Sequence, residues 1–454
     1  MRSLVKKATN KPMSKPMNKL SFYLLISLMF YQVSATAELT RVEKQLSDIA
    51  VKEKETAVKL LEDVVNINSG TMNHKGVKKV SDRFKKELNT LGMITNWYDM
   101  SEVDRAGHLF AETPLVGDKA SSTRCILLVG HLDTVFEADS PFQTFQRKGD
   151  LARGPGVNDM KGGDVVIIQA LKALHAVGEL HNKKIIVAMT GDEEKSGSPK
   201  SISRGHLVDA AKRCDIALGF ETATSLSSAT VARRGSSGWF LEVRGRRAHS
   251  SGIFSEQAGS GAVFEAARIL NSFHETLKGE AFLSFNPGTI LGGTEVDYDP
   301  TKNRGEVFGK TNVIAQKVVV HGGLRTISPE QEASARQRMK AIAENDHHNK
   351  TSALIRFSDG YPSMPMTEGN LAVMGVLNQV SNDLGYGDIS AYDPGKRGAA
   401  DVSFIAEYVD VIDGIGTEGN GAHTPDENVD LSTLPLLIQR AAILIHRLSH
   451  AEKI

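Results

Sequence analysis

A glycine-rich segment presents a single aspartate next to a predicted helix. Residues 153–163 have the sequence RGPGVNDMKGG, in which four glycines and a proline surround Asp159. The apolar pattern of a helix follows directly, over Val165–Val177. Because glycine permits tight turns, the segment is typical of a constrained loop that holds one carboxylate at a helix start. Taken alone, it is equally typical of an ordinary connection with a solvated aspartate, so its meaning depends on residues elsewhere.

Further metal-binding residue types follow three short apolar runs. These residues are His131, Asp133, Asp192, Glu193, Glu194 and Glu221, and one more histidine, His423, lies in the glycine-rich segment 418–425. Crowded carboxylates raise one another's pKa unless cations lie among them. Imidazole and carboxylate groups are ligands that suit zinc and similar divalent ions. The set therefore predicts a metal centre, with two metals and one carboxylate bridging them.

Each of these residues also has an ordinary structural explanation. A histidine at a strand end is more often a hydrogen-bonded structural residue than a ligand. Asp133, however, lies two positions after His131 and can hold its second ring nitrogen, as carboxylates do for metal-bound histidines. Glu193 and Glu194 could be acids in the first turn of a solvated helix. Because they follow a buried strand, one can instead face a metal while the other faces a bound water, and spacing alone does not decide.

Alternating strand-like and helical segments must position these residues. Two amphipathic helices are expected over 42–65 and 77–91, and strands over 125–130, 184–190 and 215–220 then alternate with helical patterns. This alternation predicts an α/β fold with a mostly parallel sheet that is covered on both faces. In such sheets ligands bind beyond the carboxyl ends of the strands. The predicted metal ligands lie at that edge.

The middle of the chain has a different pattern and no metal-type cluster. Its expected elements are strands over 238–243, 282–291 and 314–320 and helices over 261–277 and 329–344. Two helices with about four strands suit a small α+β domain inserted into the first domain. The predicted organisation is a signal peptide (1–37), a catalytic domain (38–231), an inserted domain (232–363) and the rest of the catalytic domain (364–454), with helices near 371–384 and 434–448.

Residues 1–37 are predicted to be a secretory signal peptide. Six basic residues and no acid precede the apolar run Leu20–Val33, and Ala35 and Ala37 form an Ala-x-Ala cleavage pattern. The run is short for a membrane span, although an uncleaved anchor is the alternative. The residue immediately after the predicted cleavage site is not a cysteine, which argues against a lipoprotein. The protein is therefore expected in a bacterial periplasm or outside the cell.

The mature chain is mildly acidic. Of 54 Lys and Arg residues, 48 remain after the six are removed, against 54 Asp and Glu, so the net charge is near −6. This balance disfavours nucleic acid and an anionic membrane as partners. About 417 mature residues exceed what one core usually supports, which favours two domains. Cys125 and Cys214 begin apolar runs and are expected to be two buried thiols rather than a disulfide.

Five motifs occur in an order and spacing that resemble those of the co-catalytic zinc exopeptidase and deacylase family, most of all its glutamate carboxypeptidase branch. They are Gly130–Asp133, Gly154–Gly163, Asp192–Glu194, Phe220–Glu221 and Gly421–His423, and together they span essentially the whole mature chain. The resemblance implies that His131 and Glu221 bind one zinc and that Glu194 and His423 bind the other. Asp159 would bridge both ions. Glu193 would be the general base, and Asp133 would orient His131.

Three residues of the predicted inserted domain take their meaning from the same resemblance. His249, in RRAHS, resembles the family's lid histidine, which stabilises the tetrahedral oxyanion, often from the partner subunit. Asn312 and Arg325 resemble the family's substrate-binding pair, and a guanidinium suits a free terminal carboxylate. Without the resemblance they would be a surface histidine, a turn asparagine and a strand-end arginine. Because many members dimerise through this domain, a homodimer is expected.

Two departures from the family pattern leave the substrate open. Relatives usually have a glycine-rich run with Thr or Ser before an Asp, and this chain has Lys396–Asp401 in that place. The strand that leads to Arg325 also lacks the acidic residue that is often found two positions before the Arg. The resemblance implies an exopeptidase that cleaves a C-terminal amide or peptide bond of a small molecule or short peptide with a free carboxylate, releasing an amino acid such as glutamate. Alternatives are an N-acyl amino acid deacylase or dipeptidase without glutamate preference and, from another class, an inactive metal-bound exported binding protein.

Overall fold

The computed structural model describes residues 38–114, 124–181 and 183–450. Residues 1–37 lie outside the described residues, so the signal peptide stays a prediction. Within the described ranges, no helix combines the length and the hydropathy that a membrane span requires.

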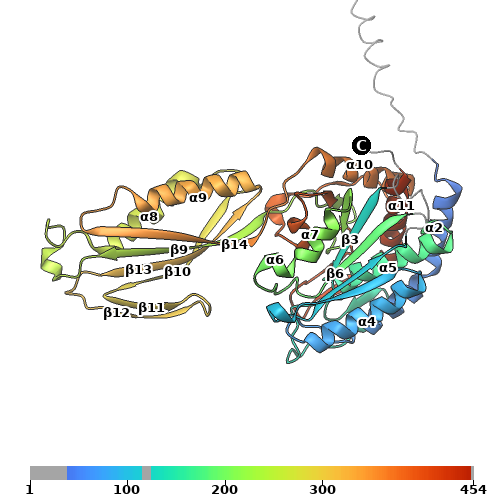
Figure 1. The fold of residues 1–454 in the computed structure, drawn as a ribbon, viewed down its shortest axis with the longest axis horizontal. Coiled ribbons are helices and arrows are strands. Elements are labelled where there is room, and N and C mark those ends of the chain that lie inside the picture. Colours follow the sequence, from blue (N-terminus) through green and yellow to red (C-terminus); the bar gives the residue numbers. More distant parts are fainter. Residues whose placement is uncertain (1–37, 115–123, 182, 451–454) are drawn as a thin grey trace, which may run out of the picture. The chain divides into compact units, whose positions relative to one another are not determined.

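A six-stranded sheet is built from the first half of the chain and one strand near its end (Figure 1). Its order is β1-β2-β6-β3-β7-β16. The parallel strands are β6 (Lys184–Thr190), β3 (Cys125–His131), β7 (Ile216–Gly219) and β16 (Asp410–Ile412), while β1 (Ile94–Asp99) and β2 (Gly107–Glu112) form an antiparallel edge. The predicted α/β fold with a mostly parallel sheet is therefore confirmed.

Both faces of this sheet are buried. Along β3, Ile126 and Leu128 belong to one hydrophobic cluster, whereas Leu127 and Val129 belong to another. The first cluster lies under α2 (Arg41–Lys52), α3 (Lys54–Val65), α4 (His74–Thr90), α5 (Lys161–Ala176), α10 (Glu368–Asp383) and α11 (Leu434–His450). The second lies under α7 (Gly205–Ala211), which follows α6 (Lys200–Ser203), and under residues 400–411. The alternation along the strand thus reflects two separate cores.

Two helices differ from their predicted limits. The single helix expected over 42–65 is divided into α2 and α3 at Glu53, whose φ of −89° and ψ of 13° depart from helical values. Helix α5 begins at Lys161, four residues before the expected Val165. Its first turn, 161–164, is buried although it is not apolar, so hydrophobic periodicity could not reveal it.

The expectation of two buried thiols is wrong, because Cys125 and Cys214 form a disulfide with a Cα–Cα distance of 4.4 Å. β3 and β7 are parallel neighbours, and the two cysteines stand where these strands begin. The backbone N–H of Asp215 donates to the carbonyl of Cys125 at 3.0 Å. Strand pairing between segments far apart in the sequence therefore brings the sulfurs together.

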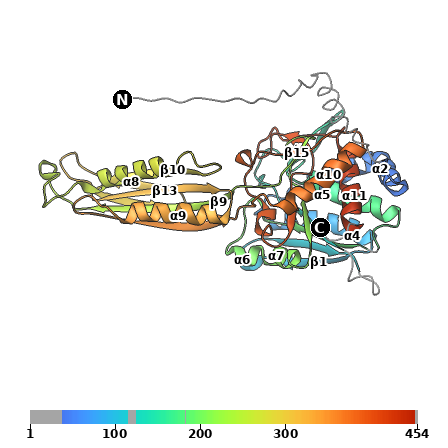
Figure 2. The same cartoon turned by 90° about the horizontal axis from the view of Figure 1, so that it is seen from above.

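A second, antiparallel sheet has the order β10-β13-β9-β14. Its strands are β9 (Gly235–Gly245), β10 (Ser284–Gly293), β13 (Lys317–Thr326) and β14 (Thr351–Tyr361), and α8 (Gly261–Leu277) and α9 (Pro329–Glu344) pack against it (Figures 1 and 2). Trp239, Phe273 and Met339 share its own hydrophobic core. The hairpin of β11 (Glu295–Asp299) and β12 (Arg304–Phe308) was not expected. The assignment of 232–363 to an inserted domain stays a prediction.

Candidate metal centre

The carboxyl ends of three neighbouring parallel strands bring most of the predicted ligands to one edge. His131, the last residue of β3, pairs with Thr190, the last residue of β6. Glu193 and Glu194 lie in the turn after β6, and Glu221 follows β7. This is the edge at which parallel sheets bind ligands.

A small sheet places the glycine-rich loop beside the loop that carries His423. Its strands, in order, are β17 (Gly419–Asn420), β18 (Asn428–Asp430), β5 (Leu151–Arg153) and β4 (Gln146–Lys148). Asn428 pairs with Arg153, Asp159 follows β5, and His423 lies between β17 and β18. Two segments that are far apart in the sequence thus meet at the edge of the main sheet.

Glu427 anchors the loop that carries Asp159. Its fully buried carboxylate accepts hydrogen bonds from the backbone N–H groups of Gly156 (3.0 Å), Asn158 (2.8 Å) and Asp159 (2.9 Å). Burial raises the pKa of Glu427 to about 7, although these three bonds lower it. Sequence reasoning missed Glu427, because beside Asp426 it resembles an ordinary loop acid.

One carboxylate lies between two histidines. Asp159 Oδ1 is 3.3 Å from His131 Nε2, and Asp159 Oδ2 is 3.2 Å from His423 Nε2. Glu221 Oε1 lies 3.6 Å from His131 Nε2, and Glu194 Oε2 lies 3.1 Å from His423 Nε2. The five predicted ligands therefore come together as two groups that share Asp159. The role of each residue stays a prediction.

The cluster has the donor atoms that a dication needs, and some of these atoms are buried without a hydrogen-bond partner. His131 Nε2 and Glu194 Oε1 are buried and have no hydrogen-bond partner among the described residues. Donor atoms of His131, Asp159 and Glu194 lie within 4.8 Å of one another, as do those of His131, Glu193 and Glu221. Burial, followed by the charge of Asp159, raises the pKa of Glu221 to about 7. A cation here would satisfy these atoms and oppose the repulsion among the carboxylates.

Asp133 connects His131 to the glutamate pair. His131 Nδ1 lies 3.0 Å from the Asp133 carbonyl oxygen and 3.5 Å from its Oδ1. The Asp133 carboxylate also accepts hydrogen bonds from the backbone N–H groups of Glu193 (3.0 Å) and Glu194 (3.1 Å) and from the Thr71 hydroxyl (2.6 Å). One buried side chain therefore contacts the imidazole and fixes the backbone of both glutamates. Nothing in the sequence around Thr71 distinguishes it.

A buried ion-pair network supports the turn that carries Glu193. Arg204, which is 1% exposed, pairs with Asp192 and, through Nε at 2.7 Å, with Asp401. Its Nη2 also donates to the Tyr361 hydroxyl at 3.2 Å, and that hydroxyl donates to the Glu193 carbonyl at 2.7 Å. Burial lowers the pKa of Arg204, but the charges of Asp401 and Asp192 more than reverse this effect. The network holds the Glu193 backbone, and sequence reasoning missed two of its side chains, Arg204 and Tyr361.

A second ion pair supports Glu221. Arg233 Nε donates to Asp413 Oδ2 at 2.6 Å, and Asp413 Oδ1 accepts the backbone N–H of Glu221 at 3.3 Å. Arg397 Nη2 donates to the Thr222 carbonyl at 2.7 Å. Arg233 and Asp413 are 180 residues apart, so no local pattern could have shown their pairing.

The three residues assigned to the substrate lie outside this cluster. His249 and Val313 form an isolated β-bridge, and the N–H of Ser250 donates to the Asn312 carbonyl at 2.9 Å, so His249 and Asn312 are neighbours. Arg325 lies near the end of β13 with an exposed side chain. Across the described residues, none of the three has a hydrogen bond or ion pair with the five clustered ligands. Their roles stay predictions.

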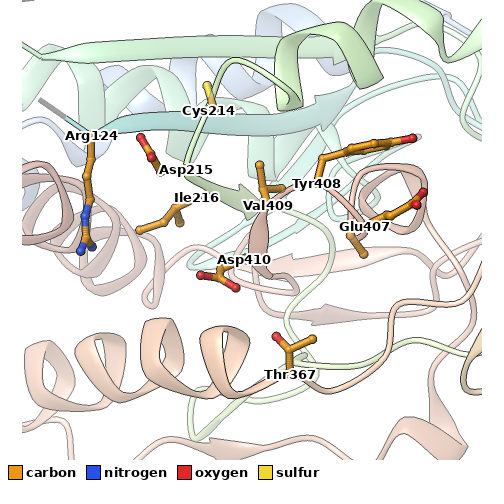
Figure 3. A pocket seen from close by; sticks show the side chains of 10 residues that line it. Arg124, Cys214, Asp215, Ile216, Thr367, Glu407, Tyr408, Val409 and Asp410 are labelled. Atoms are coloured by element: carbon orange, nitrogen blue, oxygen red, sulfur yellow. The ribbon is translucent and has the colours of Figure 1, made fainter. Parts of the chain in front are cut away.

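A surface pocket of about 460 Å³ lies at the opposite end of the same strands. Arg124, Cys214 and Asp215 line it, together with Tyr408 (Figure 3). Arg124 precedes β3, Cys214 and Asp215 precede β7, and Tyr408 precedes β16, whereas the clustered ligands follow the other ends of the strands. Asp215 already accepts the Cys125 N–H at 2.9 Å. The pocket is therefore separate from the candidate centre.

Comparisons with known proteins cover most of the chain. Residues 127–447 match the profile of Peptidase family M20/M25/M40. Carboxypeptidase G2 from Pseudomonas sp. (strain RS-16) is 25% identical over 420 residues, which span 91% of this chain and 94% of that protein. Aminopeptidase PepT from Bacillus cereus has a similar fold, with a TM-score of 0.67, 18% identity and coverage of 87% and 98%. A Bacillus subtilis dinuclear metal binding peptidase from the M20 family gives a TM-score of 0.60 at 14% identity, with coverage of 87% and 98%.

Proposed function

Since the chain belongs to Peptidase family M20/M25/M40, we propose that it is a dizinc exopeptidase that hydrolyses a C-terminal amide or peptide bond and releases an amino acid, glutamate first among them. The family resemblance expected from the five motifs is confirmed, and the chain is a metallopeptidase of this family. The zinc identity, the number of ions and the preference for glutamate belong to the proposal.

The position of Asp159 carries the proposal. Its two carboxylate oxygens face different histidines, at 3.3 Å from His131 and 3.2 Å from His423. Each histidine has its own further carboxylate, Glu221 or Glu194. A single aspartate shared by two similar donor sets is the arrangement needed to bridge two cations. His131, Glu221 and Asp159 would hold one ion, and His423, Glu194 and Asp159 the other.

Two zinc ions would lower the pKa of a water and polarise the scissile carbonyl. Glu193 supplies the base in this proposal. Without a bound metal, burial and then the charge of Glu221 raise its pKa well above the ordinary value, and bound cations would oppose the effect of Glu221. Glu193 takes a proton from the attacking water and gives it to the leaving nitrogen. Asp133 and Tyr361 hold the Glu193 backbone during this transfer.

Substrate selection is assigned to three residues that follow the family motifs. Arg325 would bind the free C-terminal carboxylate, because a guanidinium forms two parallel hydrogen bonds to a carboxylate. Asn312 would assist it, and His249 would donate to the developing oxyanion. In a homodimer formed through residues 232–363, His249 would act in the partner's site.

Two other functions compete with this one. An N-acyl amino acid deacylase or a dipeptidase would use the same metal centre and base without preferring glutamate. An inactive metal-binding protein would keep the ions and lack turnover. All five ligand positions and the Glu193 position hold residues suited to catalysis, which favours an active enzyme.

Metal analysis combined with a substrate panel tests the proposal. Two zinc ions per chain and faster turnover of N-acyl glutamate than of N-acyl alanine or dipeptides are expected. Equal rates across the panel would favour the deacylase or dipeptidase, whereas bound metal without any turnover would favour the inactive protein. Asp159→Ala should lose both ions, and a variant that keeps two would contradict the bridging role.

The role of Arg325 has its own matched comparison. Arg325→Ala should raise KM for substrates with a free carboxylate and leave KM unchanged for the corresponding amides. Arg356→Ala, an exposed arginine of β14 in the same sheet, is the control and should alter neither. Equal effects of both variants on KM would remove Arg325 from the substrate site.

We also propose that the protein is exported and that residues 1–37 are removed. The Cys125–Cys214 disulfide supports this location, because disulfides persist mainly in oxidising compartments. Expression of the full chain followed by fractionation and N-terminal mass spectrometry should find a periplasmic or secreted protein that begins at Glu38. A chain that keeps residues 1–37 would contradict cleavage.

A further inference from the structure

A second group of metal-ligand side chains lies where α5 and α11 end. Glu179 follows α5, and His446 and His450 lie on the last two turns of α11, which packs beside α5 (Figures 1 and 2). One donor atom from each residue lies within 4.8 Å of the others. The candidate metal centre is at the opposite end of α5, whose 16 residues extend about 24 Å. The two groups are therefore separate.

The Glu179 carboxylate lies near ligand spacing from both imidazoles. Glu179 Oε2 lies 3.5 Å from His446 Nδ1 and 3.6 Å from His450 Nε2. In a tetrahedral zinc site with bonds near 2.0–2.1 Å, neighbouring donors stand about 3.3–3.4 Å apart. Residues four apart share one helix face, so α11 presents both imidazoles to the same carboxylate.

The second nitrogen of His450 has an acceptor of the kind that metal-bound histidines use. His450 Nδ1 lies 2.8 Å from the His446 carbonyl oxygen. In the tautomer that donates a proton to that carbonyl, Nε2, the atom facing Glu179, is unprotonated and free to bind a metal, and the Lys183 ammonium then moves away from Nδ1. His446 Nδ1 is buried and has no hydrogen-bond partner among the described residues.

Lys183 is the group that competes with a metal. Its ammonium lies 3.3 Å from Glu179 Oε2 and 3.2 Å from His450 Nδ1, and its side chain is only 4% exposed. A dication would therefore take over the contact with Glu179 that the ammonium now makes.

We propose that Glu179, His446 and His450 form a peripheral site for a zinc-type transition-metal dication. Two imidazoles and one carboxylate are three of the four ligands such an ion takes, and water would complete the set. The site would connect the α5–β6 junction to the end of α11. It is independent of the proposed peptidase activity, because none of its residues belongs to the candidate metal centre.

The test counts bound metal in the intact protein with its resident ions left in place. After equilibration with micromolar Zn²⁺ and gel filtration, His450→Gln should hold one ion fewer per chain than the wild type and keep its activity. Loss of a ligand should weaken this site by more than about 100-fold, the upper end of the effect of outer-shell partners. His274→Gln is the matched control, since His274 is an exposed helical histidine 3.1 Å from Glu275, and it should bind as many ions as the wild type.

Two further variants keep the proposal falsifiable. Glu179 lies outside the helices, so its substitution does not alter a helix. Glu179→Gln should also bind one ion fewer per chain. Lys183→Met removes the competing ammonium and should tighten the binding of the same ion. Equal zinc counts in the wild type, His450→Gln and Glu179→Gln would overturn the site. Loss of the ion together with unchanged hydrolysis would support it and leave the proposed function untouched.

Discussion

Replacing Arg204 with methionine should both destabilise the protein and slow hydrolysis. Arg204 is 1% exposed and pairs with Asp192, whose side chain is fully buried, and with Asp401, whose side chain is 5% exposed. Methionine fills a similar length without charge, so both aspartates would stay buried without their cation. Removing one partner of a buried ion pair costs about 3–5 kcal/mol. We therefore expect the free energy of unfolding to fall by roughly 3–5 kcal/mol.

Arg213→Met is the matched control for this change. Arg213 is in the same region of the chain and forms an ion pair with Glu112, but its side chain is 49% exposed. Exposed pairs contribute only about 0–1 kcal/mol, because water screens them. Chemical denaturation of both variants, with bound metal kept constant, gives the two costs. A loss of less than about 1 kcal/mol for Arg204→Met, equal to the control, would refute the argument that buried charge decides the effect.

Kinetics separate the structural effect of Arg204 from its effect on the Glu193 turn. Arg204 contacts Tyr361, whose hydroxyl donates to the Glu193 carbonyl. If Glu193 is the base, Arg204→Met and Tyr361→Phe should both lower kcat with little change in KM. Because both act through the same contact, the double variant should lose less than the product of the two effects. Fully multiplicative losses would show that the two side chains act independently.

Four other changes have expected outcomes. Glu193→Gln should keep its metals and lower kcat by about 10²- to 10⁴-fold, and an unchanged kcat would show that the base is wrongly assigned. His249→Ala should lower kcat by about 10²- to 10³-fold if it donates to the oxyanion, and an unchanged kcat would make it a surface residue. Glu427→Ala should weaken metal binding by about 10- to 100-fold in a competition titration, whereas Asp426→Ala, an exposed neighbour, should not. Burial raises the pKa of Glu265, but hydrogen bonds from Arg268, the His348 N–H and His347 lower it to about 2. The ionised Glu265 therefore stabilises the folded protein fully above the unfolded pKa near 4.5, and this stabilisation is lost as pH falls towards 2. Glu265→Gln should lower the free energy of unfolding by roughly 1–2 kcal/mol at pH 7. The variant should also weaken the dependence of that free energy on pH in the acid range.

The strand ends and the glycine-rich loop could be predicted because their signals are local. A short apolar run followed by His131 or Glu221 places the side chain at a sheet edge once the sheet is parallel. Glycines around Asp159 indicate a tight loop without knowledge of any other segment. Alternation along the chain gave the fold class for the same reason.

The supporting residues could not be predicted because each depends on a distant partner. Glu427 bonds to the loop of Asp159 from 268 residues away, and Arg204 reaches Asp401 across 197 residues. Alone, each resembles an ordinary charged residue of a loop or helix. The disulfide was missed for the same reason, since Cys125 and Cys214 meet only after β3 and β7 pair.

The segment that departs from the family pattern also takes on a different meaning. In the sequence, Lys396–Asp401 suggests altered substrate contacts. In the structure, Asp401 pairs with Arg204, which contacts Tyr361 and through it the Glu193 carbonyl. Arg397 donates to the carbonyl of Thr222, which follows Glu221. One short segment therefore holds the backbone next to the proposed base and next to one proposed ligand. A substitution in Lys396–Asp401 would change catalysis by moving Glu193 or Glu221, even if the substituted side chain makes no contact with the substrate.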